Sequence, residues 1–421
     1  MNLSWPLIFS QLFLLIGVLL GAILVVRILL QRNTPQVTIA WLLAILFLPY
    51  IGVPLYLFLG GRKVRRATAK KQPLNFTCVA LSPSDGTEPI RRLLEAYAIP
   101  APCANNHLEV LNTGEQAYKR LLQLIDQACT SIHIAIYVFD KDPVAETIRD
   151  HLTRKAREGV QIRVLLDGVG SLHTHRRFFS TLLQAQGQVA YFMPLLHRPF
   201  RGRTNLRNHR KIVLIDDVTV WTGGRNIGAE YMGPAPAPHR WRDISFILRG
   251  PAVVHYQDVF RADWEFAYGD RLESTWIEHA SGPSPCPGQG IVQVVPSGPD
   301  LPHDALYDAI VSMAFAAQQR LWIVSPYFVP DHALSQALAI AARRGIDVRI
   351  IVPAESNYTL VDLVRGRYLR DLQRAGAKIL LYTPGMMHAK MLLKDQDLAM
   401  IGSANMDIRS LFLDYEIAAF F

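Results

Sequence analysis

The sequence predicts an α/β protein that contains two duplicated units and is preceded by two transmembrane helices. Three observations lead to this prediction: two long uncharged runs open the chain, helix-type and strand-type segments then alternate, and the same series of segments occurs twice. Because alternating strands and helices build a buried sheet covered by helices, we expect a mostly parallel sheet in each unit.

The first element is a membrane anchor. The runs Leu7–Val26 and Thr38–Gly60 are uncharged over 20 and 23 residues, and each can cross about 30 Å of hydrocarbon at about 1.5 Å per residue. Pro49 and Pro54 predict a kink in the second span. A cleaved signal peptide is a less favoured alternative, because the first run lacks a preceding basic region and a small-residue cleavage site. A buried hairpin is also disfavoured, because helices so uniformly apolar would need protein on every side.

The basic residues are concentrated beside this anchor. Residues 1–71 hold eight Lys and Arg and no Asp or Glu, which is +8 of the net charge of +9, so the other 350 residues are almost neutral. This flank predicts that the larger part of the chain is cytoplasmic and that the flank contacts anionic lipid headgroups. The neutral remainder argues against nucleic acid as a partner. The four scattered cysteines form no CxxC pair, which fits a reducing compartment and argues against a zinc site.

The remaining elements form two series. Residues 72–112 are interpreted as a connector with one short strand and one helix, Pro89–Ala98. The expected helices are Gly114–Ala128 and Pro143–Glu158, then 305–318 and Asp331–Arg344; the expected strands are Ile132–Phe139 and Val160–Leu166, then Leu321–Phe328 and Ile346–Val352. A Pro- and Gly-rich linker at 281–290 divides the chain into the anchor (1–71), the connector, a first domain (113–280) and a second domain (291–421). The cleft between two packed units is a favoured place for a site.

One motif, H-x-K-x₄-D, occurs once in each unit. Its two copies are His209, Lys211 and Asp216, and His388, Lys390 and Asp395. Each copy is followed by a Gly-rich turn that ends in asparagine, Asn226 and Asn405, and the spacing from His to Asn is 17 residues in both. Equal spacing in a duplicated chain makes an accidental match implausible.

The motif suits chemistry at a phosphate group. His and Lys two positions apart on a strand face the same side and can address one phosphate. Lysine and asparagine stabilise its oxygens, while one histidine can attack phosphorus and another can protonate the leaving oxygen. The aspartate is harder to place, and orienting a histidine of either unit is one interpretation. We expect no metal, because His with Lys is a poor ligand set and Lys must lose its proton to coordinate a metal. We also expect no other cofactor. The remaining alternative to a catalytic motif is that its histidines are structural and that its Lys and Asp form surface ion pairs.

These paired motifs resemble the phospholipase D superfamily, and the residues around them resemble the bacterial cardiolipin synthase family. The matching stretches extend over nearly the whole chain and include 205–212, 221–228, 241–243, 296–300 and 402–410. The resemblance implies two α/β/α phospholipase D-like domains with one active site at their interface. It also leads us to expect a C-terminally short second domain, because the chain stops at Phe421 in a strand-type segment.

The resemblance assigns roles to individual residues. It implies that His209, Lys211, Asp216, His388, Lys390 and Asp395 are catalytic and that Asn226 and Asn405 bind phosphate. Asp243 and Glu416, each downstream of its motif, look like the acidic partners that orient the histidines. One departure stands out: Gly224 occupies the position of Ser403 in the second copy, so the first unit lacks one hydroxyl donor.

The implied reaction is phosphatidyl transfer between two phosphatidylglycerol molecules, giving cardiolipin and glycerol through a phosphatidyl-histidine. His209 would attack phosphorus and His388 would act as acid and base, or the reverse. The implied location is the bacterial inner membrane, with a multi-pass anchor and a cytoplasmic catalytic domain.

Some alternatives stay open at this point. A phospholipase D-type hydrolase, a phosphatidylserine synthase and a membrane-anchored lipid-binding protein are the competing functions. A basic cluster before the first motif either holds anionic headgroups or forms a solvated loop; it consists of Arg198, Arg201, Arg203, Arg207 and Arg210. The sequence does not decide the acceptor, the acyl-chain preference or the oligomeric state.

Overall fold

The computed structural model describes residues 17, 19–29, 35–56, 71, 74–77, 89–194, 206–270, 272 and 288–421. The chain divides into two compact units, Met1–Ala67 with Arg198–Arg203, and Thr68–His197 with Thr204–Phe421. The first unit holds the predicted anchor, and the second holds both motifs.

The anchor unit is helical where it is described. Residues 19–29 form a helix, and α2 (Pro35–Phe47) is followed by α3 (Pro49–Leu55), with the break at Leu48. Pro49 at the first turn of α3 explains the break, because proline has no backbone N–H and favours the start of a helix over its interior; Pro54 lies inside α3. The run predicted as one kinked span therefore contains two short helices. Of the helices within the described ranges, none combines the length and the apolar character needed to cross a membrane. Most of the first run, Leu7–Val26, lies outside the described residues.

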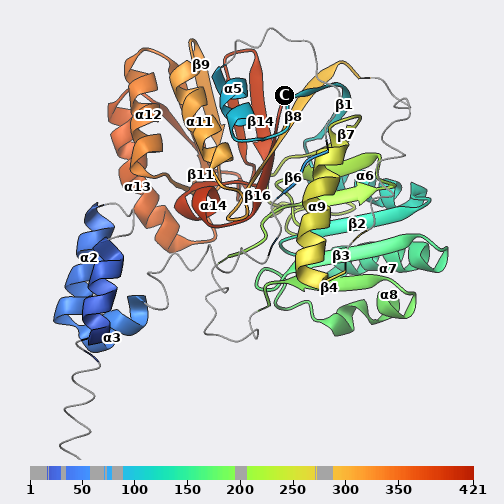
Figure 1. Ribbon diagram of the computed structural model, residues 1–421. Coiled ribbons are helices and arrows are strands. Elements are labelled where there is room, and N and C mark those ends of the chain that lie inside the picture. The colour runs from blue at the N-terminus through green and yellow to red at the C-terminus, as the bar shows by residue number, and fades with distance from the viewer. Residues whose placement is uncertain are drawn as a thin grey trace, which may run out of the picture. The chain divides into compact units, whose positions relative to one another are not determined.

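The larger unit is built on one sheet of fourteen strands (Figure 1). The strands of the first half are β1 (Cys103–Leu111), β2 (Ser131–Ile136), β3 (Gln161–Asp167), β4 (Gln188–Phe192), β5 (Ile212–Ile215), β6 (Thr219–Gly223) and β7 (Ser245–Arg249). Those of the second half are β8 (Gly290–Ser297), β9 (Arg320–Val324), β11 (Asp347–Pro353), β12 (Lys378–Tyr382), β13 (Met391–Lys394), β14 (Leu398–Gly402) and β16 (Glu416–Phe420). The order is β12-β11-β9-β13-β14-β16-β8-β1-β7-β6-β5-β2-β3-β4, so both halves repeat one order outward from the central β8–β1 pair.

The sheet is mixed rather than mostly parallel, which corrects the prediction. Only the two outermost pairings of each half are parallel, and the others are antiparallel. The reason is the turn after each motif strand, where Asp216, Asp217 and Asp395 have φ of 50°, 58° and 50°. Such tight turns join only antiparallel neighbours, and aspartate is among the residues that tolerate this backbone region.

The helices cover both faces of this sheet (Figure 1). They are α5 (Pro89–Ala96), α6 (Gly114–Gln127), α7 (Pro143–Arg157), α8 (Ser180–Gln184), α9 (Val253–Tyr268), α11 (Ala305–Ala316), α12 (His332–Arg343), α13 (Thr359–Arg374) and α14 (Ile408–Phe412). Thr113 and Gln116 form a capping box on α6, and the side chains of Asp142 and Asp331 cap α7 and α12. The four helices predicted in the two series are confirmed to within two residues. The predicted strand Leu321–Phe328 is interrupted after β9, and its end forms the short strand β10 (Phe328–Val329), which pairs with β15 (Met406–Asp407).

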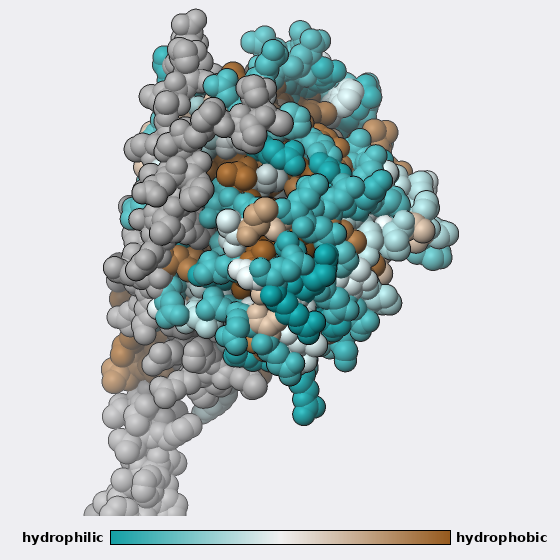
Figure 2. All heavy atoms as spheres, turned by 90° about the vertical axis from the view of Figure 1, so that its right-hand side faces the viewer, coloured by the Kyte–Doolittle hydropathy of each residue, from teal (hydrophilic) through white to brown (hydrophobic). Residues whose placement is uncertain are grey.

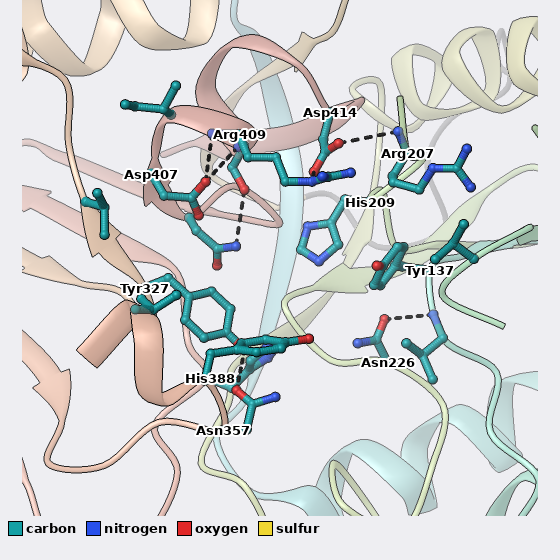
Figure 3. A pocket seen from close by; sticks show the side chains of 18 of the residues that line it. Tyr137, Arg207, His209, Asn226, Tyr327, Asn357, His388, Asp407, Arg409 and Asp414 are labelled. Carbon is teal, nitrogen blue, oxygen red and sulfur yellow. Dashed lines mark hydrogen bonds and ion pairs between the residues drawn. The ribbon is translucent and has the colours of Figure 1, made fainter. Parts of the chain in front are cut away.

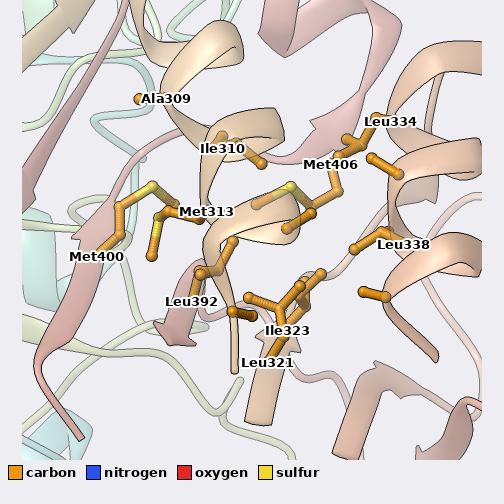
Figure 4. Packing of buried hydrophobic residues seen from close by; sticks show 14 of the residues in the cluster. Ala309, Ile310, Met313, Leu321, Ile323, Leu334, Leu338, Leu392, Met400 and Met406 are labelled. Carbon is orange, nitrogen blue, oxygen red and sulfur yellow. The ribbon is translucent and has the colours of Figure 1, made fainter. Parts of the chain in front are cut away.

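Each half has its own hydrophobic core. In the second half, side chains of α11, α12 and the sheet fill the core shown in Figure 4. Ile90 and Leu94 of α5 belong to this second core, although α5 precedes the first half in sequence. The stretch 72–112 thus contributes α5 to one core and β1 to the centre of the sheet. The outer face of the first half is mainly hydrophilic, with hydrophobic residues scattered over it (Figure 2).

Candidate active site

The two motif segments meet in the middle of the larger unit, where each half pairs with the other through its backbone. His209 lies just before β5 and His388 just before β13, so neither histidine is inside a strand. The amide of His209 donates to the carbonyl of Tyr415 at 2.9 Å, and the amide of His388 donates to the carbonyl of Arg242 at 2.7 Å. These contacts set each histidine beside the acidic segment of the opposite half.

The histidines and the two expected acids are paired crosswise. Nδ1 of His209 lies 2.9 Å from Oε1 of Glu416, and Nδ1 of His388 lies 2.6 Å from Oδ2 of Asp243. Both carboxylates are fully buried, and the imidazoles are 11% and 5% exposed. When Nδ1–H donates to a carboxylate, Nε2 is the ring nitrogen that can take part in chemistry, and Nε2 of His388 lies 3.1 Å from Nζ of Lys390. Each half therefore supplies the acid that orients the histidine of the other half.

Both histidines open into one pocket with a volume of about 720 Å³. Figure 3 shows them reaching this cavity from different halves of the sheet. Asn226 and Asn405 also line it, and Asn405 donates from Nδ2 to Ser410 at 3.1 Å. Across the described ranges, no group of three or more His, Cys, Asp or Glu side chains is placed to hold a metal ion.

The two histidine–acid pairs differ in charge. Burial and the neighbouring lysines lower the pKa of both histidines, that of His388 to about 3. Burial opposes ionisation of Asp243, but Lys390 and His388 outweigh it and lower its pKa. Burial raises the pKa of Glu416 to about 7 although Lys211 opposes the shift. At neutral pH, His388 therefore faces a fully ionised carboxylate, whereas His209 faces one that is partly protonated.

The two motif lysines are buried beside the histidines. Burial lowers the pKa of Lys211 to about 7 and that of Lys390 to about 8, against the raising effect of the nearby carboxylates. Nζ of Lys211 donates to the carbonyl of His209 at 2.6 Å, and Lys390 donates to the carbonyl of His388. A negatively charged phosphate group in the pocket would raise both pKa values and keep both ammonium groups charged.

The motif aspartates are not at this site, which corrects the expectation that they are catalytic or orient a histidine. Asp216 accepts the amide protons of Cys129, Thr130 and Ser131, at distances of 2.7 to 3.1 Å. Asp395 accepts those of residues 318–320 in the same way. Each lies beyond a four-residue strand from its histidine, which separates them by roughly 13 Å or more. Their contacts hold the loops that lead into β2 and β9.

Aromatic residues around the histidines were missed by the sequence analysis. Tyr137 packs edge-on against His209 with ring centroids 4.8 Å apart, and Tyr231 and Trp241 pack against His388 at 5.3 and 5.2 Å. Tyr327 of the second half lies 6.4 Å from His388. The echo between Tyr137-Val-Phe139 and Pro326-Tyr-Phe328 was the available signal, but it was interpreted only as evidence of duplication.

Where it is described, the basic cluster before the first motif is buried rather than a solvated loop, and its Arg207 lines the pocket. Arg207 is buried and donates to Asp167 at 3.3 Å and to the carbonyl of Met193 at 3.1 Å. Arg210 is fully buried and forms a bidentate pair with Asp263 at 2.8 and 2.9 Å. Arg198, Arg201 and Arg203 lie outside the described residues.

Arg210 belongs to a buried ion cluster beneath the first motif. Lys71 lies 2.5 Å from Asp263 and 2.6 Å from Asp300, and all three side chains are fully buried. Asn208 also donates to Asp263, at 2.9 Å. Lys71 is therefore not free to contact lipid headgroups as expected of the basic flank. It joins the N-terminal part of this unit to α9 and to the loop after β8, and Asp263 of α9 in turn contacts the loop that carries His209.

The structure explains why position 224 is a glycine. A Cβ on Gly224 would overlap the carboxylate of Asp243, with Cγ only 3.0 Å away. In the second half, Ser403 fills the equivalent position and donates its hydroxyl to the longer Glu416. The first half thus lacks this hydroxyl because Asp243 occupies the space that a side chain at position 224 would need.

We expect Gly224→Ala to lower kcat roughly 10- to 100-fold, because it displaces Asp243 from His388. Ser403→Gly is the matched control, since it removes a hydrogen bond without a clash and should cost less. Steady-state kinetics of both variants check this. Equal losses, or a wild-type kcat for Gly224→Ala, would contradict the explanation.

Two family models match the chain. The model described as "Cardiolipin synthase, PLD-like domain" matches residues 121–264 and 310–421, and the model described as "Phospholipase_D-nuclease N-terminal" matches residues 19–61. The major cardiolipin synthase ClsA of Bacillus subtilis is 33% identical, over 98% of this chain and 89% of the relative. Cardiolipin synthase A of Pseudomonas fluorescens is 33% identical, over 94% of this chain and 85% of the relative.

A solved structure shares the fold. Phosphatidylserine synthase of Haemophilus influenzae superposes with a TM-score of 0.60 at 17% identity, over 79% of this chain and 86% of that one. Because the first family model describes a PLD-like domain, the mixed sheet with its repeated strand order is the phospholipase D-like α/β fold. Together with the matched family model and the relatives, this shows that the chain belongs to the cardiolipin synthase family of phospholipase D-like phosphatidyltransferases.

Proposed function

We propose that this chain is a cardiolipin synthase that transfers a phosphatidyl group between two phosphatidylglycerol molecules, giving cardiolipin and glycerol. One observation carries the proposal: His209 and His388 line one pocket, each is paired with a buried carboxylate of the opposite half, and a buried lysine lies beside each histidine. A two-step transfer at one phosphorus needs a nucleophile, an acid and base, and fixed positive charge. Membership of the family narrows the product to cardiolipin.

In the first step, Nε2 of His209 attacks phosphorus and the bond to the glycerol oxygen breaks. Nε2–H of His388 gives its proton to that oxygen, and a phosphatidyl-histidine forms. Burial and Lys390 lower the pKa of His388 in the free enzyme, whereas ionised Asp243 and the negative charge of a bound phosphate both raise it and favour the imidazolium needed for this acid role. Partly protonated Glu416 gives less support to a charge on His209, which suits a neutral nucleophile. These differences support the assignment of the two roles.

In the second step, His388 takes the proton of the hydroxyl on the second phosphatidylglycerol, and that oxygen attacks phosphorus. The bond from phosphorus to Nε2 of His209 breaks, and cardiolipin leaves. Lys211 and Lys390 would stabilise the non-bridging oxygens in both steps, with Asn226 and Asn405 as additional donors. The energy of the broken ester is conserved in the intermediate, so the scheme uses no cofactor.

The lysines predict an alkaline limb in the pH profile. In the free enzyme both must be protonated, so kcat/KM is expected to fall as the pH rises through about 7 to 8. The bound phosphate raises both pKa values, so kcat should stay level to a higher pH. Lys211, with the lower pKa, sets the start of this limb, so Lys211→Arg keeps its charge and should move the limb upward even where the rate is lower. An unchanged limb in that variant would rule out Lys211 as its origin.

We further propose that the N-terminal unit anchors the enzyme in the bacterial inner membrane, with the catalytic part on the cytoplasmic side and divided into domains at 113–280 and 291–421. Large apolar side chains cover the described anchor helices and the break between α2 and α3; Leu29, Leu46, Phe47 and Tyr50 are 61 to 74% exposed. Such a surface suits lipid rather than water. Retention of the full chain in the membrane pellet after alkaline extraction supports the anchor, and complete release would contradict it.

The products formed from labelled phosphatidylglycerol test the function. The detergent-purified full chain is incubated in EDTA, and the lipids are separated by thin-layer chromatography beside the double variant His209→Ala/His388→Ala. Cardiolipin with an equal amount of glycerol, absent from the control, is the expected result. Phosphatidic acid alone would make the enzyme a hydrolase, and no turnover would leave a lipid-binding role.

A further inference from the structure

The pocket continues onto an exposed apolar rim. Four of its lining residues are large and exposed to solvent: Tyr358, Leu360, Val364 and Ile408, at 57, 72, 42 and 48%. Leu363, one turn of α13 away, is 77% exposed. Exposed apolar side chains that gather at the mouth of a site mark an interaction surface, whereas scattered ones need no explanation.

The same face of α13 becomes basic along the helix. Leu360, Leu363 and Val364 are followed at helical spacing by Arg367, Arg370 and Arg374, and all six side chains are exposed. The opposite face, with Arg365, Leu369 and Leu372, is buried. Two acidic groups lie on α13: Asp362 pairs with Arg365 at 3.1 Å, and Asp371 pairs with Arg374 at 3.3 Å on the surface. The exposed face therefore has an apolar end at the pocket and a basic end away from it.

We infer that this face of α13 docks onto the surface of a bilayer that contains anionic phospholipid, and that the apolar rim receives the acyl chains as the headgroup enters the pocket. The inference rests on the proposed function, because that function supplies a substrate with two long acyl chains. Leucine and valine inserted among the lipid tails, with arginines at the level of the phosphates, form the pattern of an interfacial helix. Continuity between the rim and the catalytic pocket favours lipid over a protein partner.

Docking of this rim on a bilayer would explain how a phospholipid headgroup reaches the buried histidines. His209 and His388 are almost fully buried, yet the acyl chains of a phospholipid cannot be hydrated at low cost. A docked rim would let the headgroup reach the histidines while the chains stay in an apolar environment. Water would at the same time be kept from the intermediate at the mouth of the pocket.

Fluorescence quenching tests the contact directly. Leu363→Trp in the full chain is reconstituted into vesicles of phosphatidylcholine and phosphatidylserine at 7:3, with the phosphatidylcholine either dibrominated or unmodified. Val218→Trp, at an exposed position in the turn beyond β5, is the matched control. We expect extra quenching and a blue-shifted emission for Leu363→Trp only. Equal quenching of the two variants, or none at 363, would overturn the inference.

Kinetics then test its importance for the reaction. The variant Arg367→Gln/Arg370→Gln should need roughly 25-fold more phosphatidylglycerol in a bilayer to reach half-maximal rate, because each of the two cations near an anionic surface contributes about fivefold. Its rate on monomeric short-chain phosphatidylglycerol should match the wild type. Equal losses on both substrates would mean a damaged site rather than lost docking. If the wild type released only phosphatidic acid, the proposed function would fail while the quenching result would still stand.

Discussion

Replacement of His209 by alanine is expected to abolish both cardiolipin formation and the covalent intermediate. The rate should fall by roughly four orders of magnitude or more, as it does when a nucleophile or its base is removed from other covalent enzymes. His388→Ala should be equally inactive on phosphatidylglycerol, because glycerol is a poor leaving group without an acid. The rate alone therefore does not separate the two roles.

A substrate with a good leaving group does separate them. The phosphatidyl ester of p-nitrophenol needs no acid in the first step, so His388→Ala should release one burst of p-nitrophenol and retain label on the protein. His209→Ala should show neither the burst nor the label. Acid-quenched samples are measured for nitrophenol and for protein-bound label. The reverse pattern would exchange the roles of the two histidines, and label on both variants would contradict a single nucleophile.

Removal of the Lys71 charge is expected to destabilise the larger unit strongly. Lys71→Met leaves Asp263 and Asp300 buried, with Arg210 as their counter-charge among the described residues. Breaking a buried ion pair on one side typically costs about 3–5 kcal/mol. Urea denaturation of the detergent-solubilised chain, followed by tryptophan fluorescence, measures the free energy of unfolding.

Two further variants make this result specific. Lys378→Met removes a surface pair with Asp347 in which the lysine is 63% exposed, and should cost less than about 1 kcal/mol. The double variant Lys71→Met/Asp300→Asn restores charge balance and should recover part of the loss. No recovery would mean that packing of the lysine stem, rather than charge, dominates the effect of Lys71.

Local elements of this fold were predictable, whereas the order of the sheet was not. The helices capped by Thr113, Asp142 and Asp331 begin where side-chain caps and apolar periodicity agree. A run such as Ile212–Ile215, by contrast, looks the same in a parallel and in an antiparallel strand. Its direction is decided by the turn at Asp216 and Asp217, whose positive φ the sequence does not reveal.

The residue types at the site could be predicted from the sequence, but which acid pairs with which histidine could not. Asp243 and Glu416 were expected near the histidines, yet their exchange between halves depends on where the backbones of Tyr415 and Arg242 run. The expectation that the motif aspartates lie at the site was wrong, because equal spacing in the two motifs does not show that the strands β5 and β13 carry the aspartates away from the histidines. Lys71 was misjudged for a related reason, because its acidic partners lie 192 and 229 residues away.

Because each histidine pairs with an acid of the other half, the order of synthesis decides when each pair can form. His209 leaves the ribosome 207 residues ahead of Glu416, which is roughly 10–40 s at the usual rate of synthesis. His388 is made 145 residues after Asp243, so its acidic partner is already present when His388 emerges. The first motif cannot be oriented until β16 is made and inserted between β14 and β8. A nascent chain whose first half is complete therefore lacks the acid that orients His209.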